Sequence, residues 1–315
     1  MSIVEKIKEN RPNIKETTIN SYFQYIKKIY QILNDTTELP KNVNFLNDFE
    51  EIDKIMEKYK PNTKKNYYSA IVVALKAYEK DKDLISKYEE VRDEVQTNYD
   101  NMTKANKKTD KQKENWVSLE EYDKLIEKYK KEIKIKKYFT IKELNKKGYE
   151  TLKEYIILLT YRYLPLRNDF ANMKILSKRS YDSISKKDKE ENNYLVGTKA
   201  TGFKFYINDY KTKKTFGNKV IDIPEKVEKE IKKYVKQNPT EYFLTDTNRN
   251  PITPNGITKL LTKIFQNEYN KNVSSSMIRH IILSEKYGET LEEMKKDSEI
   301  MGHGMNMQKD YTKTD

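Results

Sequence analysis

The strongest constraint on the fold is a polar stretch that divides the chain about a third of the way along. Residues 100–115 read DNMTKANKKTDKQKEN, with one methionine and no other large apolar side chain. Such a segment cannot contribute to a hydrophobic core, so we expect it to be exposed. A length of 315 residues leaves room for two domains. The sequence therefore predicts domains at 1–100 and 116–315, joined by a basic linker at 101–115.

The first domain has the apolar periodicity of helices. Large apolar residues recur at steps of three and four within 19–33, 49–59, 67–78 and 84–95. Pro40 and Pro61 fall between these segments, where proline is tolerated. Four amphipathic helices with short connections predict a small helical bundle.

The second domain has a mixed pattern. A capping box, Ser118 with Glu121, opens one helix, and a strongly apolar helix at 151–164 ends before Pro165. Residues 177–193 form a polar insertion. The segments YLVGTKA, FKFYIND and NKVIDI, within 194–223, are rich in β-formers and separated by turns. The expected fold class is mainly α with a small three-stranded antiparallel sheet.

The C-terminal part of the second domain is expected to be helical again. From residue 253 to the end the pattern is that of helices, with breaks predicted near Asn272, Gly288 and Gly302.

Charge and composition narrow the class of function. The net charge is +13, with −1 in residues 1–100 and +14 in the rest, which favours a polyanionic partner. The absence of cysteine excludes disulfides and thiol nucleophiles, and two histidines make a histidine-built zinc site improbable, so we expect no metal and no cofactor. No apolar run is long enough for a membrane span, and the N-terminus has no secretion signal. We therefore expect an intracellular protein that is neither secreted nor membrane-bound.

Arginine is rare here, and its positions are informative. Only seven of the 62 cationic residues are arginine, so an arginine in an apolar context indicates a need for its planar fork. Arg167 lies in YRYLPLRNDFANMKI and Arg279 in SSSMIRHIILSEKYG. Two arginines near one phosphate can hold its oxygens and stabilise a five-coordinate transition state. For Arg167, an ion pair with Asp169 or another carboxylate is an equally good interpretation.

The last residues, MGHGMNMQKDYTKTD, hold two further candidates. His303 lies between two glycines at a predicted helix break, and Tyr311 lies in a polar tail with almost no apolar neighbours. Because a phenol has a pKa of about 10, use of Tyr311 as a nucleophile requires neighbouring cations or a base.

Taken together, these residues resemble the tyrosine recombinase (phage-type integrase) family across the whole chain. LLTYRYLPLRNDFANMKI is similar to the first arginine motif, at Arg167. INDYKTKKTFGNKVIDIPE is similar to the β-hairpin lysine motif, at Lys211, with Lys213 and Lys214 as alternatives. SSMIRH is similar to the second arginine motif, with Arg279, His280, and Ser276 where the family usually has His or Lys. Gly302–His303 and Tyr311 match the terminal elements.

Two positions depart from the family pattern. The acidic residue usually lies three places after the first arginine, where this chain has Phe170, and Asp169 is one place early. The separation of His303 and Tyr311 is one residue shorter than the commonest form. The Leu-Arg-Asn-Asp context looks most like integrases of large DNA viruses and their mobile elements, which implies a host nucleus or a cytoplasmic viral factory.

The resemblance implies DNA strand transfer without metal or ATP. Tyr311 would attack a phosphodiester to form a 3′-phosphotyrosyl bond, and Arg167 and Arg279 would clamp the phosphate. Lys211 would protonate the departing 5′ oxygen, and His303 would hydrogen-bond the phosphate or accept the tyrosine proton. Ser276 could only donate a hydrogen bond.

The resemblance also implies a partner and an architecture. Double-stranded DNA would be held in a two-domain, C-shaped clamp made of a helical (SAM-like) core-binding domain and a catalytic domain. Homodimers or tetramers would form on the DNA. Further candidate DNA contacts are listed by segment: Lys64 and Lys65 in the first domain; Lys104, Lys107 and Lys108 in the linker; Lys213, Lys214 and His280 beside the catalytic residues.

Three alternatives stay open. The linker lysines could serve only to keep that segment solvated. A type IB topoisomerase uses a similar residue set, and a DNA-binding protein without catalysis could keep the same scaffold.

Overall fold

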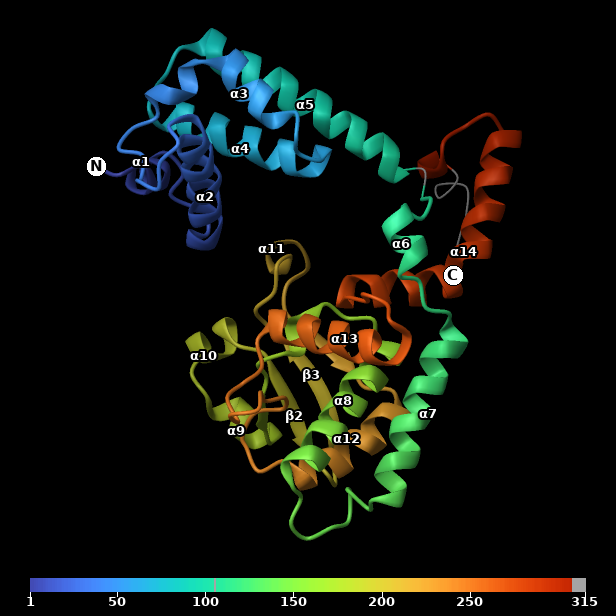
Figure 1. Cartoon of the computed structure of the whole chain (residues 1–315). Coiled ribbons are helices and arrows are strands. Elements are labelled where there is room, and N and C mark those ends of the chain that lie inside the picture. Colours follow the sequence, from blue (N-terminus) through green and yellow to red (C-terminus); the bar gives the residue numbers. More distant parts are fainter. Residues whose placement is uncertain (105, 308–315) are drawn as a thin grey trace. The chain divides into compact units, whose positions relative to one another are not determined.

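The computed structural model describes residues 1–104 and 106–307, with the side chains of 102–104 left aside. The chain divides into two compact units, Met1–Lys107 and Lys108–Asp315, which we call unit 1 and unit 2 (Figure 1). Each has its own hydrophobic core. Across the described residues, no helix is both long enough and apolar enough to cross a membrane.

Unit 1 is helical, as its periodicity predicts. The four predicted helices correspond to α2 (Glu16–Leu33), α3 (Phe49–Met56), α4 (Pro61–Ala77) and α5 (Lys82–Lys104). Helix α4 lies at the centre, buried at almost every position from Tyr67 to Leu75. Two further elements were not predicted: α1 (Ile3–Asn10), which buries only Ile3 and Ile7, and the 3-10 turn η1 (Asn44–Asn47).

The segment predicted as a linker is largely helical. Helix α5 runs through Lys104, and α6 (Asp110–Glu114) begins at a capping box formed by Thr109 and Gln112. Lysine, glutamate and glutamine all favour helix, so a polar composition that cannot form a core can still form helical turns. The polarity of this stretch therefore excluded an apolar core but not helix.

Unit 2 is built around α8 (Lys146–Tyr163), the apolar helix that the sequence predicts. It is buried on almost every side, and α7 (Leu119–Ile135) and α12 (Glu225–Gln237) pack against it. The remaining helices are η2 (Asn168–Phe170), α9 (Lys178–Ser183), α10 (Lys186–Glu191), α11 (Lys213–Phe216), α13 (Pro254–Tyr269) and α14 (Ser275–Ile300). The polar insertion at 177–193 thus contains two short helices.

The sheet of unit 2 has four strands in the order β1 (Lys174–Leu176), β2 (Tyr194–Thr198), β3 (Gly202–Ile207), β4 (Lys219–Asp222). Strands β2, β3 and β4 form the predicted antiparallel meander. The prediction of a purely antiparallel, three-stranded sheet is wrong, because β1 pairs in parallel with β2. A three-residue strand is too short to show an alternating pattern, and a parallel partner requires the crossover that α9 and α10 supply.

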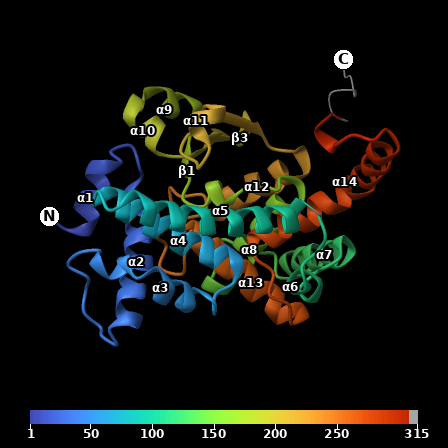
Figure 2. The same ribbon diagram turned by 90° about the horizontal axis from the view of Figure 1, so that it is seen from above.

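The two faces of the sheet are covered differently. Leu195, Phe203 and Phe205 face the main core with α8 and α12. On the other face, Tyr181 of α9 packs against Tyr194 and others in a small separate cluster. Figure 2, a view from above, shows α9 and α10 on the opposite side of the strands from α12.

Helix α14 continues without the break predicted at Gly288. One glycine costs a helix about 1 kcal/mol relative to alanine, which does not stop it. The first turns, as far as Ile282, are buried against unit 2, whereas almost all later residues to Ile300 are exposed or half-exposed. Figures 1 and 2 both show this later part extending away from the sheet of its own unit.

Candidate active site

Arg167 stands at the start of η2, directly after the turn at Pro165. Its Nη2 donates a hydrogen bond of 3.0 Å to the hydroxyl of Thr212, and its Nε lies 3.5 Å from Oδ2 of Asp169. The guanidinium carbon is 5.8 Å from the centroid of the Tyr210 ring. The ion pair with Asp169 considered from the sequence is therefore present. With 34% of its side chain exposed, the fork is still open to a ligand.

Asp169 lies within the electrostatic field of both arginines. Burial raises the pKa of its carboxyl above the usual value, Arg167 and Arg279 both act to lower it, and Asp209 raises it. Arg279 also opposes the burial that raises the pKa of the Tyr161 phenol. The two arginines, far apart in sequence, thus both act electrostatically on the Asp169 carboxyl.

Arg279 occupies the second turn of α14 and has an unsatisfied donor. Its Nη2 donates to the hydroxyl of Ser276 at 3.0 Å. Its Nε is shielded from solvent and has no hydrogen-bond partner among the described residues. A buried donor without a partner costs about 1–3 kcal/mol. An anion that accepted from this Nε would remove that cost.

A polar network holds η2 and α14 in place for the two arginines. The amide of Asn168 donates to the Pro254 carbonyl (2.5 Å) and to the Thr258 hydroxyl (2.9 Å), and its oxygen accepts from the Tyr161 hydroxyl. Thr258 in turn lies 3.2 Å from the hydroxyl of Ser275. Through α13, the residue after Arg167 is therefore linked to the first turn of α14.

Asn193 joins η2 to the end of β3. Its amide donates to the carbonyls of Asp169 and Asp209, at 2.8 Å each. Its oxygen accepts from the backbone of Asn208 (2.7 Å) and Asp209 (2.8 Å). Because Asn193 is buried, these bonds are shielded from water, and they fix where the loop after β3 leaves the sheet.

The loop after β3 carries the three candidate lysines. Lys213 donates from Nζ to the carbonyl of Glu190 at 2.9 Å, which ties its side chain to α10 by a hydrogen bond. Lys211 and Lys214 are exposed. Lys211 directly precedes Thr212, the hydroxyl partner of Arg167. Lys211 and Lys213 flank Thr212 in the sequence, and Lys211 is the exposed one of the two.

His303 is not brought to the arginines. The helix segment from Arg279 to Ile300 is roughly 30 Å long at a rise of about 1.5 Å per residue. Gly302, at φ +69°, ends the helix, and the His303 amide donates to the Ser298 carbonyl at 3.0 Å. The Gly-His pair is thus part of a helix C-cap. The His303 ring lies against Met301, with Nε2 3.2 Å from the sulfur. Tyr311 lies outside the described residues.

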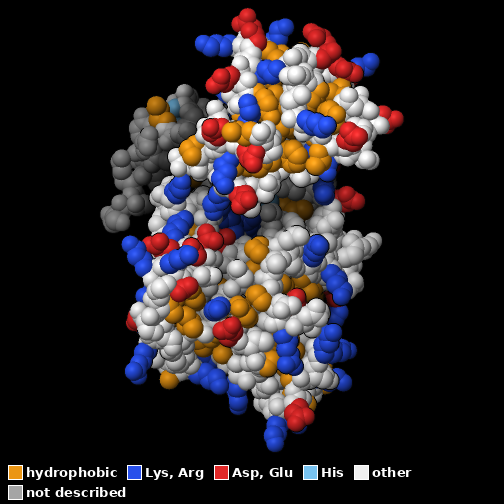
Figure 3. Space-filling view, turned by 90° about the vertical axis from the view of Figure 1, so that its left-hand side faces the viewer, with side chains coloured by type: hydrophobic (Ala, Val, Ile, Leu, Met, Phe, Trp, Pro, Cys, Tyr) orange, Lys and Arg blue, Asp and Glu red, His pale blue; other side chains and the backbone are white. Residues whose placement is uncertain are grey.

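The other cationic candidates are dispersed. Lys64 and Lys65 are half-buried on α4, Lys107 is exposed, and the side chain of Lys104 lies outside the described residues. Lys108 stacks on Trp116, with Nζ 3.7 Å from the ring centroid. His280 is exposed beside Arg279. On the face shown in Figure 3, lysine and arginine side chains are spread among acidic ones rather than gathered in a single patch.

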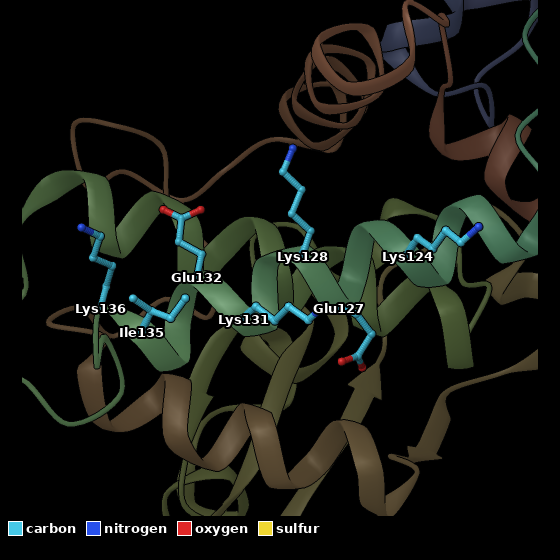
Figure 4. Close-up of a pocket in the computed structure, with 7 residues that line it drawn as sticks. All are labelled: Lys124, Glu127, Lys128, Lys131, Glu132, Ile135 and Lys136. Atoms are coloured by element: carbon cyan, nitrogen blue, oxygen red, sulfur yellow. The ribbon is translucent and has the colours of Figure 1, made fainter.

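A separate hollow of about 590 Å³ lies along the outer face of α7. Figure 4 shows its charged side chains spread along the helix, with Lys128 and Glu127 pointing to opposite sides. Lys128 is paired with Glu268 of α13. These side chains do not converge on a common point, so this hollow is a solvated helix face rather than a catalytic pocket.

Sequence reasoning missed Thr212, Asn168 and Asn193. Asn168 and Asn193 each stand beside a segment with a clear pattern, and Thr212 lies in the lysine-rich turn. The roles of all three depend on partners far along the chain. An asparagine next to a strand is common, and nothing in its local context distinguishes a turn residue from a link between segments.

The chain was compared with known proteins. No protein-family model matches it, and none of the curated proteins matches it. Among solved structures, it is similar to the XerH site-specific recombinase bound to difH substrate in a pre-cleavage complex, with a TM-score of 0.51, and to XerH bound to palindromic difH in a post-cleavage complex, with 0.50. Both alignments cover 99% of this chain and 80% of XerH, at 14% identity.

The chain has a recombinase-like fold. At 14% identity this likeness concerns the backbone architecture, mainly helical with a small sheet. The arginine site is defined by contacts within this chain and not by that likeness. Arg167 lies 3.5 Å from Asp169 and Arg279 acts on the pKa of the same carboxyl, and guanidinium groups are the side chains suited to binding a phosphate.

Proposed function

We propose that the protein is a site-specific DNA recombinase or integrase that breaks and rejoins DNA by transesterification. The observation that carries this proposal is the pair of half-exposed arginines: Arg167 lies 3.5 Å from Asp169, and Arg279 acts on the pKa of the same carboxyl. The likeness to the site-specific recombinase XerH, which is bound to difH substrate in both structures, supports the same function. The affinity with viral and mobile-element integrases rests on the motif context alone.

In this proposal the reaction conserves the number of phosphoester bonds. The phenolate of Tyr311 attacks the phosphorus, a phosphorus–oxygen bond forms, and the bond to the 5′ oxygen breaks. That oxygen takes a proton from Lys211, and the phenolic proton passes to His303. Arg167 and Arg279 stabilise the charge on the non-bridging oxygens.

The position of His303 adds a requirement to this mechanism. His303 follows the part of α14 that extends away from the arginines, so the reaction requires it to approach the cluster, together with Tyr311, eight residues later in the sequence. The proposed dimer or tetramer on DNA would allow a neighbouring copy to supply them. Lys64, Lys65 and Lys107 would contact the DNA backbone, which predicts strongly salt-dependent binding.

A library of nicked duplexes with a randomised core tests the proposal without a known target site. A nick beyond the scissile phosphate lets the short 5′ product diffuse away and traps the phosphotyrosyl bond. We expect the wild-type protein to form adducts that survive SDS, and sequencing of the bound DNA to give the preferred site. Tyr311→Phe and Arg279→Ala should form none. Adducts that persist with Tyr311→Phe, or their absence with the wild type, would refute the proposal.

One observation favours a second candidate. The distance of His303 from the arginines fits a DNA-binding protein that has kept the scaffold without catalysis. That protein would retard duplexes in a gel and form no covalent adduct. A type IB topoisomerase would form the adduct and relax supercoiled plasmid as a monomer, whereas a recombinase would pair two sites.

A further inference from the structure

We propose that Thr212 is a positioning residue that couples the lysine-bearing loop to Arg167, so that the phosphate clamp and the proton donor are held together. The loop meant here is Tyr210–Gly217, between β3 and β4. This inference rests on the proposed function, because it assigns Lys211 to protonation and Arg167 to the phosphate.

The geometry of Thr212 is unusual for a helix N-cap. Thr212 precedes α11, and its carbonyl accepts from the amides of Thr215 (3.1 Å) and Phe216 (3.2 Å). A threonine in this position normally turns its hydroxyl to an amide of the first helical turn. Here the hydroxyl makes no such cap and instead accepts from Nη2 of Arg167 at 3.0 Å. The loop thus uses its capping group for a contact with the candidate active site.

The hydroxyl is a suitable partner because it is neutral. Arg162 shows the alternative: its Nε and Nη2 both bind the carboxylate of Asp123, at 2.6 and 3.0 Å, which uses the fork and neutralises it. Thr212 holds Arg167 by one donor, Nη2, and adds no negative charge to that of Asp169, which lies 3.5 Å from Nε. Ser276 likewise accepts one hydrogen bond from Nη2 of Arg279 and is itself neutral.

The contact also constrains Lys211. Within the described part of unit 2, two side-chain hydrogen bonds link this loop to other elements: Arg167 to Thr212, and Lys213 to the Glu190 carbonyl. The Tyr210 hydroxyl bonds within the loop, to the Gly217 carbonyl. Loss of the Thr212 hydroxyl therefore removes the link that lies next to Lys211 and leaves the one toward α10.

Hydrogen–deuterium exchange of the peptide that spans the loop tests the structural half without DNA. Thr212→Val removes the hydroxyl at nearly constant shape, Thr212→Ser keeps it, and Thr215→Val is a matched control in the same loop. We expect exchange to rise severalfold in Thr212→Val and in Arg167→Ala, and to stay near wild type in the other two. Equal exchange in Thr212→Val and Thr215→Val would overturn the inference.

Cleavage of the duplex recovered from the randomised library tests the functional half. Two versions are compared, one ordinary and one with sulfur in place of the 5′ bridging oxygen. A thiolate leaves without protonation, so the sulfur version does not need the lysine. Thr212→Val should slow cleavage of the ordinary duplex by about tenfold to a hundredfold, the loss expected for one hydrogen bond to a charged group. The sulfur version should recover most of that loss, as it should for Lys211→Ala.

The outcomes separate the inference from the proposed function. If the sulfur version does not relieve the cleavage defect of Thr212→Val, Thr212 affects only Arg167 and not protonation by Lys211. That result would overturn the proposed link between the loop and Arg167. Full activity of Thr212→Val on both duplexes would also overturn it. If the wild type forms no adduct with any duplex, the proposed function is refuted, and loop exchange alone decides whether Thr212 holds the loop to Arg167.

Discussion

Replacement of Arg279 by methionine tests whether this arginine serves ligand binding rather than the stability of the fold. Methionine preserves much of the apolar stem and removes the guanidinium. The variant loses one hydrogen bond, from Nη2 to the exposed hydroxyl of Ser276. It also loses the buried Nε that has no partner among the described residues.

The two changes have opposite signs. A hydrogen bond at an exposed site contributes about 0.5–1.5 kcal/mol, whereas an unpaired buried donor costs about 1–3 kcal/mol. Arg279→Met should therefore leave the free energy of unfolding unchanged or raise it by up to about 2 kcal/mol. A loss of function without a loss of stability is the pattern of a site that binds a ligand at the expense of the free protein's stability.

Arg162→Met is the matched control. Arg162 is also a half-buried arginine in unit 2, and both its Nε and its Nη2 are bonded to the Asp123 carboxylate. Because charge-assisted hydrogen bonds are worth about 1.5–3 kcal/mol, this variant should lose about that much unfolding free energy. The same substitution thus has opposite expected effects at the two positions.

Urea denaturation in a buffer free of phosphate and sulfate gives both free energies. Inorganic phosphate is then added at matched ionic strength. Phosphate bound by the arginine pair raises the midpoint of the wild type and of Arg162→Met but not of Arg279→Met, since a ligand that binds only the folded state stabilises it. If Arg279→Met is as destabilised as Arg162→Met, or responds equally to phosphate, the reasoning about the unpaired donor is wrong.

Two further predictions concern buried charges of α8. Burial raises the pKa of Glu154 above 4.5, against a hydrogen bond from Tyr129. Because the raised pKa favours the neutral form in the folded state, the free energy of unfolding should fall as pH rises above about 4.5, and Glu154→Gln should lack this fall in urea titrations from pH 4 to 7. Lys153, 2% exposed, donates to Glu150 (2.6 Å) and to the Thr245 carbonyl (2.9 Å). Lys153→Met should therefore lower the free energy of unfolding by about 3 kcal/mol, and adding Glu150→Gln to that variant should recover part of the loss. Equal free energies for the single and double variants would contradict this.

Local patterns in the sequence predicted the regular elements well. The four predicted helices of unit 1, the apolar α8 and the meander each contain a run of residues long enough to show its period. Strand β1 has three residues, and its parallel pairing depends on a crossover, so no local signal indicated it. At Gly288 a local signal was misleading, because a helix interior tolerates one glycine.

The candidate site was predicted only in part, since its assembly depends on contacts between distant segments. The rarity of arginine singled out Arg167 and Arg279, and both act to lower the pKa of Asp169. The same reasoning could not show that Asn168 and Asn193 hold their elements in place, because their partners lie far along the chain. Nor could it show that α14 carries His303 away from the arginines.

The arginines of this chain differ in the acceptor that each one meets, and this difference bears on function more directly than their number does. Arg162 is held by a carboxylate that satisfies its fork and cancels its charge. Arg167 and Arg279 are each held at Nη2 by a hydroxyl, and Asp169 near Arg167 has a raised pKa. A hydroxyl fixes the direction of a guanidinium without neutralising it, so both forks are oriented in the free protein, and the Asp169 carboxyl lies 3.5 Å from Nε of Arg167. A phosphate that arrives at the pair then meets donors already in place, which is the arrangement that stabilises a transition state at the least cost in reorganisation.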